Sequence, residues 1–136
     1  MTIVLDASVL IAHANPVDEH HRAAEGLLTQ WAPFGYAASV LTLAEFYVGP
    51  ARTGHLAAAQ AMIVGLAVTA IDIPAVAAAE LAQIRARHAL KMPDAVVLYT
   101  AKMHADALGT FDTRLGAAAR LAGIQVVPDY GTGAYL

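Results

Sequence analysis

The sequence predicts an α/β fold in which a central, mainly parallel sheet of four to five strands is flanked by helices. Short runs rich in Val and Ile alternate with longer segments of helical periodicity, which is typical of strand–helix–strand crossovers. Six prolines are expected where these segments start or stop. At 136 residues the chain has the usual length of one domain, so a single domain over 1–136 is expected.

Each expected element follows from a local pattern. The strands are short apolar runs, beginning with Thr-Ile-Val-Leu, and they cover Thr2 to Leu5, Gly35 to Ala38, Val68 to Ile71, Ala107 to Phe111 and Ile124 to Val127. The helices are the longer patterns beside them, namely Ala7 to Ala14, Glu19 to Gln30, Leu41 to Val48, Leu56 to Gly65, Pro74 to Ala89, Pro93 to His104 and Thr113 to Ala122. The Gly-containing tail, Pro128 to Leu136, is expected to be irregular.

The composition is apolar and excludes several kinds of chemistry. Hydrophobic residues make up 58% of the chain, only 14% of residues are charged, and the mean hydropathy is +0.54, so part of the apolar surface is expected in an interface. The absence of cysteine excludes disulfides, thiolate catalysis and Cys-based metal sites, and it fits a cytoplasmic protein. A net charge of −3 gives no global sign of a nucleic-acid partner.

Neither a targeting signal nor a membrane span is expected. The amino-terminal run reaches Asp6 without the positive region and cleavage site of a signal peptide. Two stretches without charged residues, Gly26 to Ala44 and Thr53 to Ile71, approach the length of a span. Both are interpreted as a buried helix followed by a strand, because prolines, glycines and weakly apolar alanines interrupt them.

Four acids occupy the positions where chemistry is expected in a parallel sheet. Ligand sites of such sheets lie beyond the carboxyl ends of the strands. Asp6 ends the first predicted strand and Asp112 the fourth, while Asp94 opens an apolar helix and Glu45 lies in an apolar segment. Taken singly, the aspartates could cap helices and Glu45 could face solvent.

Taken together, the four acids favour a metal site. Crowded carboxylates repel one another, a cation relieves that repulsion, and all-oxygen ligands suit Mg²⁺ or Mn²⁺. The chain has no Gly-rich phosphate loop and no Gly-x-Ser-x-Gly elbow. Its histidines lack a metal-ligand pattern and are interpreted mostly as surface residues: His13, His20, His21, His55, His88 and His104. Carboxylate-held Mg²⁺ is suited to phosphodiester hydrolysis.

At this point the sequence resembles the PIN-domain nucleases, and among them the VapC toxins of type II toxin–antitoxin pairs. The resemblance spans nearly the whole chain and rests on an ordered set of motifs: Ile3-Val4-Leu5-Asp6-Ala7-Ser8, Leu43-Ala44-Glu45, Met92-Pro93-Asp94-Ala95 and Gly109-Thr110-Phe111-Asp112. It implies a PIN-like (Rossmann-like) sandwich and a Mg²⁺- or Mn²⁺-dependent ribonuclease. The implied metal ligands are Asp6, Glu45, Asp94 and Asp112, and Ser8 and Thr110 match the small hydroxyl positions that orient carboxylates or waters.

One departure from the family pattern concerns the metal count. Many PIN domains carry a further acid shortly after the last one, where this chain has Asp112-Thr113-Arg114-Leu115. We therefore expect one tightly held ion. Substrate phosphates need positive partners, for which Arg85, Arg87 and Lys91 are candidates, and a solvated helix face is the alternative for these three.

Other functional classes remain open to different degrees. A phosphatase of the haloacid dehalogenase type is disfavoured because Ser8 stands where its second acid belongs, and a receiver domain because Lys102 is the last lysine. A binding module that uses its apolar surface rather than its acids is an alternative. A DNA-directed nuclease is another, since nothing in the sequence indicates recognition of a 2′-hydroxyl.

The apolar excess and the resemblance together predict partners. We expect a homodimer that binds a VapB-type antitoxin, whose amphipathic segment lies in an apolar groove around Leu41, Phe46 and Tyr47, with Trp31 and Phe34 as further candidates. An antitoxin Arg inserted among the four acids is the simplest inhibitor. The alternative is a monomer whose apolar residues only fill an Ala-rich core.

Overall fold

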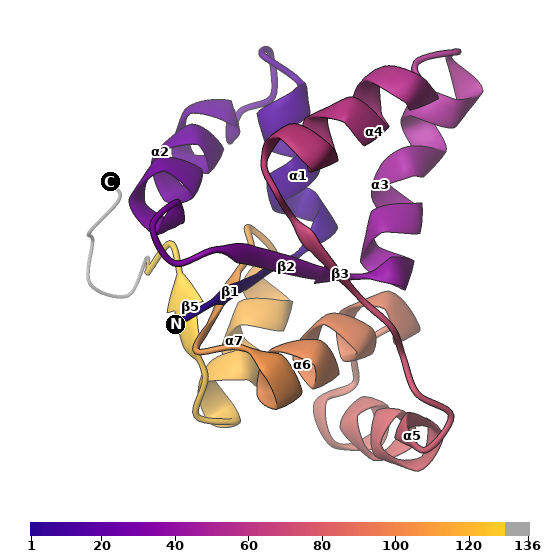
Figure 1. Cartoon of the computed structure of the whole chain (residues 1–136). Helices are drawn as coiled ribbons and strands as arrows, with labels where there is room; N and C mark the ends of the chain where they lie inside the picture. Colours follow the sequence, from indigo (N-terminus) through magenta and orange to yellow (C-terminus); the bar gives the residue numbers. More distant parts are fainter. Residues whose placement is uncertain (130–136) are drawn as a thin grey trace.

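The computed structural model describes residues 1–129 and has a five-stranded, fully parallel sheet with helices on both faces (Figure 1). The predicted fold class is confirmed. The strands lie in the order β3-β2-β1-β4-β5. In chain order the elements are β1 (Ile3–Leu5), α1 (Ala7–Ala14), α2 (His21–Trp31), β2 (Tyr36–Ser39), α3 (Val40–Arg52), α4 (Leu56–Gly65), β3 (Thr69–Ile71), α5 (Ala77–His88), α6 (Met92–His104), β4 (Ala107–Gly109), α7 (Thr113–Leu121) and β5 (Gln125–Val127).

Two apolar layers hold the helices to the sheet. On one face α1, α2, α3 and α4 pack over side chains such as Ile3 and Leu5, and on the other α5, α6 and α7 pack over Val4 and Leu108. Successive residues of β1 point to opposite faces, as a strand's period of two requires. Because both faces are covered, the central strands β1 and β4 are fully buried.

Several expected boundaries are corrected by the structure. Pro50 does not end a segment but lies in the last turn of α3, where a missing N–H costs only one hydrogen bond and the Pro50 carbonyl accepts from His55 N. The α5 helix begins at Ala77 rather than Pro74, because a turn from Pro74 to Ala77 precedes it. The α2 helix begins at His21 after a turn at Asp18.

The expected burial of the uncharged stretches is also partly wrong. The edge strand β3 leaves Thr69 and Ala70 exposed, and α4 buries only Ala59 and Ile63. Conversely, Trp31 was expected on the surface, but it is 5% exposed within the core. In residues 1–129 no helix combines the length and the apolar character needed to cross a membrane. The tail expected to be irregular lies mostly outside the described residues.

Candidate metal centre

The centre of the candidate site is the junction of β1 and β4. These strands are parallel neighbours with Leu5 opposite Gly109, and Asp6 N donates to Gly109 O across the junction at 2.9 Å. This register places Asp6 beside Thr110, although 104 residues separate them in the chain. The expected strand from Ala107 to Phe111 is shorter, because the ladder ends at Gly109 and the next residues turn toward α1 and α7.

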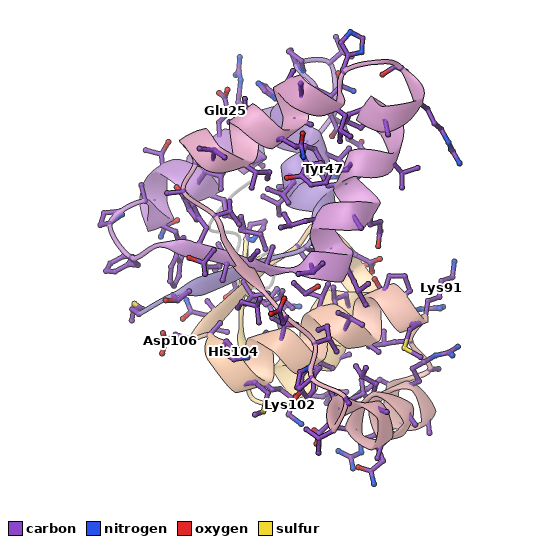
Figure 2. The ribbon with its side chains drawn as sticks, turned by 45° about the vertical axis from the view of Figure 1, so that its right-hand side comes forward. Glu25, Tyr47, Lys91, Lys102, His104 and Asp106 are labelled. Atoms are coloured by element: carbon purple, nitrogen blue, oxygen red, sulfur yellow. The ribbon has the colours of Figure 1, made fainter. Side chains whose placement is uncertain are left out.

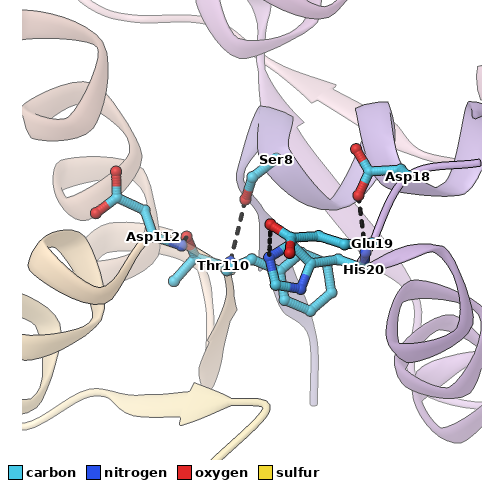
Figure 3. A network of polar contacts seen from close by, with 7 residues as sticks. Ser8, Asp18, Glu19, His20, Thr110 and Asp112 are labelled. Carbon is cyan, nitrogen blue, oxygen red and sulfur yellow. Dashed lines mark hydrogen bonds and ion pairs between the residues drawn. The ribbon is translucent and has the colours of Figure 1, made fainter.

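Two hydroxyl groups orient the Asp6 carboxylate. Ser8 Oγ donates to Asp6 Oδ2 at 2.9 Å and Thr110 Oγ1 donates to the same oxygen at 2.8 Å. Each hydroxyl also accepts from the backbone of the turn after β4, Ser8 from Phe111 N (Figure 3) and Thr110 from Asp112 N. Since those N–H groups occupy the hydroxyl lone pairs, the hydroxyl protons point to Asp6. The predicted orienting contacts of Ser8 and Thr110 are therefore present.

Asp112 and Asp6 each begin a helix as well as contributing to the acidic group. Asp6 Oδ1 accepts from Ala7 N at the start of α1, and Asp112 Oδ1 accepts from Leu115 N at the start of α7. Asp6 is buried and Asp112 is exposed. The capping interpretation is correct for both, and it does not exclude a second task, because each carboxylate has a further oxygen.

Glu45 and Asp94 come from two helices that pack against each other near the same end of the sheet. Asp94 lies in the first turn of α6, which begins with Met92 and Pro93, and Glu45 lies in the middle of α3. Proline suits the first turn, where its missing N–H is not needed. Glu45 is exposed and Asp94 is half-buried. In residues 1–129 no ion pair joins either acid to a basic side chain.

Burial and the charges of neighbouring carboxylates raise the pKa values of acids in this group. Burial, followed by the charges of Asp112, Asp6 and Glu45, raises the pKa of Asp94 to about 6, against a small opposing effect of Lys91. Burial and then the charge of Asp6 raise the pKa of Glu45. Burial also raises the pKa of Asp6, an effect opposed by the hydrogen bonds from Thr110, Ser8 and Ala7. Burial and mutual repulsion thus oppose ionisation of these carboxyl groups.

The donor set fits a hard divalent cation, although a complete ligand cage is not preformed. Within residues 1–129, no three His, Asp or Glu side chains converge closely enough to hold a metal ion by themselves. Mg²⁺ keeps several waters and needs only one or two direct carboxylates, so the remaining acids can act through water. Three of these oxygen donors, Asp6, Glu45 and Asp94, have raised pKa values, and a hard divalent cation would relieve the repulsion that contributes to the rise.

Among the three candidate phosphate-binding residues, Lys91 is the one whose charge acts on Asp94. Lys91 precedes α6, near whose first turn it lies in Figure 2, and its charge lowers the pKa of Asp94. Arg85 instead donates from Nε to Leu90 O at 2.9 Å and fixes the turn between α5 and α6. Arg87 is exposed on α5.

An apolar hollow opens beside Glu45. It has a volume of about 460 Å³ and lies between α1 and α3, with Glu45 at its lining and Ile11, Phe46 and Pro50 among the apolar walls. A second hollow of about 320 Å³ shares Phe46 and Pro50 and extends along α4 to Met62. The two form one groove, called here the α1–α3–α4 groove. Phe46 is buried rather than protruding, and forms part of the groove's wall.

The sequence interpretation missed an aromatic pair at the rim of the acidic group. His20 stacks on Phe111, with ring centroids 4.6 Å apart and an interplanar angle of 9°. Figure 3 shows the His20 ring beside Ser8 and Thr110. No local pattern connects residues 20 and 111. The one available signal was that His20 stands at the helix N-cap, where Ser, Thr, Asp or Asn is usual, and its side chain makes no capping bond.

The family of the chain follows from this fold and from the sequence match. The model of the PIN domain family matches residues 3–121, so the chain belongs to the PIN domain family. No curated protein matches the chain.

The fold of the chain is similar to that of several solved structures from toxin–antitoxin systems. The chain is similar to VapC20 of Mycobacterium tuberculosis, described as a sarcin-ricin loop cleaving toxin, with 24% identity, a TM-score of 0.70 and coverage of 85% of this chain and 94% of that one. A toxin–antitoxin complex from Klebsiella pneumoniae is 28% identical, with a TM-score of 0.66 and coverage of 82% and 87%. VapBC2 from Rickettsia felis, bound to a promoter DNA fragment, has 17% identity, a TM-score of 0.70 and coverage of 93% and 97%. The resemblance to PIN domains of the VapC type is thereby confirmed.

Proposed function

We propose that this chain, folded as one domain, is a metal-dependent endoribonuclease that acts in the cytoplasm as the toxin of a toxin–antitoxin pair. The observation that carries the proposal is the acidic group at the carboxyl ends of β1 and β4, where burial and then the charges of three other carboxylates raise the pKa of Asp94 to about 6. In this proposal Asp6, Glu45, Asp94 and Asp112 hold Mg²⁺ or Mn²⁺, either directly or through water.

The chain's own residues have distinct tasks in this proposal. Ser8 and Thr110 hold Asp6 in one orientation, so that a ligand oxygen is in place before a cation arrives. Lys91 attracts the substrate phosphate to the rim of the acidic group. A bound divalent cation supplies Lewis-acid activation of water and neutralises charge that develops on the phosphate.

Hydrolysis of RNA tests the proposal directly. Purified protein is incubated with total RNA in Mg²⁺, in Mn²⁺ and in EDTA, and the products are resolved on a denaturing gel. We expect cleavage only with a divalent ion, and Asp94→Asn to reduce it by at least 100-fold, because the ligand charge is lost. Asp106→Asn is the matched control, since Asp106 lies before β4 at the opposite end of the sheet and an asparagine oxygen can still accept from Thr2 N.

Three outcomes would contradict this proposal. Full cleavage in EDTA would exclude metal dependence. Cleavage of DNA alone would favour the DNA-directed nuclease. RNA binding without cleavage under any metal condition would favour a binding module.

We further propose that an antitoxin of the VapB type covers the α1–α3–α4 groove and that the toxin is a homodimer. The groove has apolar walls suited to an amphipathic segment and reaches Glu45, where an antitoxin Arg can pair with carboxylates. Exposed Leu41 and Val48 add apolar surface on the same helix as Glu45. The known complexes named above have antitoxins bound to toxins of this fold, which supports the proposal.

A further inference from the structure

We propose that His20, backed by Phe111, is a stacking platform for an unpaired nucleobase next to the scissile phosphate. This inference rests on the proposed ribonuclease function and names how that site binds its substrate. Unpaired RNA bases are commonly bound on aromatic rings, whose flat faces accept any base. A platform of this kind would select single-stranded segments, because a base inside a duplex has no free face.

The position of the platform is fixed relative to the acids by a short chain of contacts. Asp6 accepts from Ser8 Oγ, and Ser8 Oγ accepts from Phe111 N at 3.1 Å. Phe111 stands between Thr110 and Asp112 in the chain; it is 9% exposed, and its ring stacks against His20. Asp6 and the aromatic pair are therefore connected through Ser8 and the turn after β4.

The His20 ring is held at its edge and remains accessible. Asp18 Oδ1 accepts from His20 N at 2.8 Å, which fixes the backbone, and Glu19 Oε1 lies 3.4 Å from His20 Nε2 (Figure 3). The side chain of His20 is 38% exposed although one face lies against Phe111. This leaves surface on which a second flat ring can stack.

The local sequence also argues against a purely structural task. His20 occupies the N-cap of α2, but its side chain makes no capping hydrogen bond. A nucleobase partner would account for an aromatic ring with a polar edge at position 20.

Binding of an oligoadenylate and of its abasic counterpart tests the platform. The probes are a fluorescent six-nucleotide oligoadenylate and a ribose–phosphate chain of the same length without bases. Their affinities are measured by anisotropy with Asp94→Asn protein in Mg²⁺, so that cleavage does not interfere. We expect His20→Ala to weaken oligoadenylate binding by roughly 5- to 150-fold, which corresponds to the 1–3 kcal/mol of one stacked base, and to leave abasic binding within about twofold.

Two further substitutions separate stacking from packing. His20→Tyr retains a flat ring and should keep the preference for bases, whereas His20→Leu fills the space over Phe111 without a π face and should lose it. His104→Ala, at the far end of α6 from Asp94 (Figure 2), is the matched control and should change neither affinity. The melting temperature of each variant reports on its fold, and His20→Leu replaces His20→Ala if the latter does not fold.

The results distinguish this proposal from the ribonuclease proposal. The platform would be overturned if His20→Ala and His20→Leu weakened the binding of both probes equally, or weakened the binding of neither. It would also be overturned if the parent protein bound the oligoadenylate no more tightly than the abasic chain. Cleavage of RNA by the wild-type chain together with such a result would leave the ribonuclease intact. A base preference that depends on His20, without cleavage in any metal, would instead support the platform and overturn the ribonuclease.

Discussion

At the scale of single residues, the key arrangement is a carboxylate oxygen that accepts two hydroxyl protons. Asp6 Oδ2 binds Ser8 and Thr110, and both hydroxyls are in turn held by backbone N–H groups. These neutral donors stabilise the ionised form of Asp6 without removing its charge. A salt bridge to Arg or Lys would neutralise this negative charge. The hydroxyl donors do not, so the charge stays available to a cation.

The raised pKa of Asp94 predicts how metal-free stability depends on pH. Between the ordinary value of 3.8 and about 6, the unfolded chain ionises Asp94 while the folded chain keeps its proton. Stability is therefore lost as pH rises through this window, and the loss is complete above pH 6. In EDTA, Asp94→Asn should melt a few degrees higher than the wild type at pH 7.5, with no difference near pH 4, as measured by scanning calorimetry.

Metal addition should reverse this effect. Titrating Mg²⁺ at pH 7.5 should raise the melting temperature of the wild type but not of Asp94→Asn, because the cation neutralises the repulsion that destabilises the folded state. A metal-free Asp94→Asn protein that melts several degrees lower than the wild type at pH 7.5 would show that Asp94 is a structural cap.

The residues of the acidic group were predictable because their positions obey a local rule. Asp6 follows a strand and Asp94 opens a helix, and parallel topology brings such positions together. Glu45 was identified by its apolar context, although it is exposed in the structure. His20 was not predictable, because its contact with Phe111 depends on how α2 lies against the turn after β4.

At the scale of elements, β4 ends where its backbone turns away from the sheet and begins to bind the hydroxyl groups beside Asp6. The strand was expected to continue to Phe111, but Phe111 N and Asp112 N bind hydroxyl groups instead of a neighbouring strand. Pro50 was expected to end α3, and the helix continues through it for two further residues. Periodicity identifies an element, whereas its last turn depends on tertiary partners that the pattern does not contain.

Gly109 in β4 provides a prediction about packing of the strand beneath the site. A Cβ at this position would lie 3.2 Å from Leu5 Cδ2 and 3.3 Å from Ile3 Cδ1. We expect Gly109→Ala to lower the free energy of unfolding by about 1–3 kcal/mol in a urea titration, since overpacked cores lose stability. Gly116→Ala in α7 is the control, because its Cβ meets Val126 Cγ1 at an ordinary 3.5 Å, and it should raise stability by about 0.5–1 kcal/mol. Equal effects of both changes would contradict this account.

At the scale of the whole molecule, the core buries only some of the many apolar side chains of the sequence. Ile11, Leu41, Val48 and Leu56 remain exposed on α1, α3 and α4, around the α1–α3–α4 groove. Surface of this kind is typical of an interaction site. The sequence analysis expected exposed apolar surface, and this surface is present. It also placed Trp31 there, but Trp31 is buried in the core.

Antitoxin binding gives the corresponding prediction. The product of the adjacent small open reading frame should form a complex with the chain, and Ile11→Glu in the groove should weaken that complex at least tenfold by burying a charge. Val76→Glu is the control, since Val76 is exposed outside the groove. Inhibition of cleavage should weaken as Mg²⁺ rises, because the antitoxin Arg and the cation compete for the same carboxylates. A single-chain mass in sedimentation and no complex on co-expression would contradict both proposed partners.

The order of the strands has a consequence for when the acidic group assembles during synthesis of the chain. β1 lies in the middle of the sheet, between β2 and β4, and Asp6 meets Thr110 only after 104 further residues have been added. Contacts of such long separation form late in folding and slow it. A nascent or truncated chain that lacks β4 thus leaves Asp6 without Thr110 and Asp112. The ribosome therefore completes most of this polypeptide before the proposed metal site can assemble.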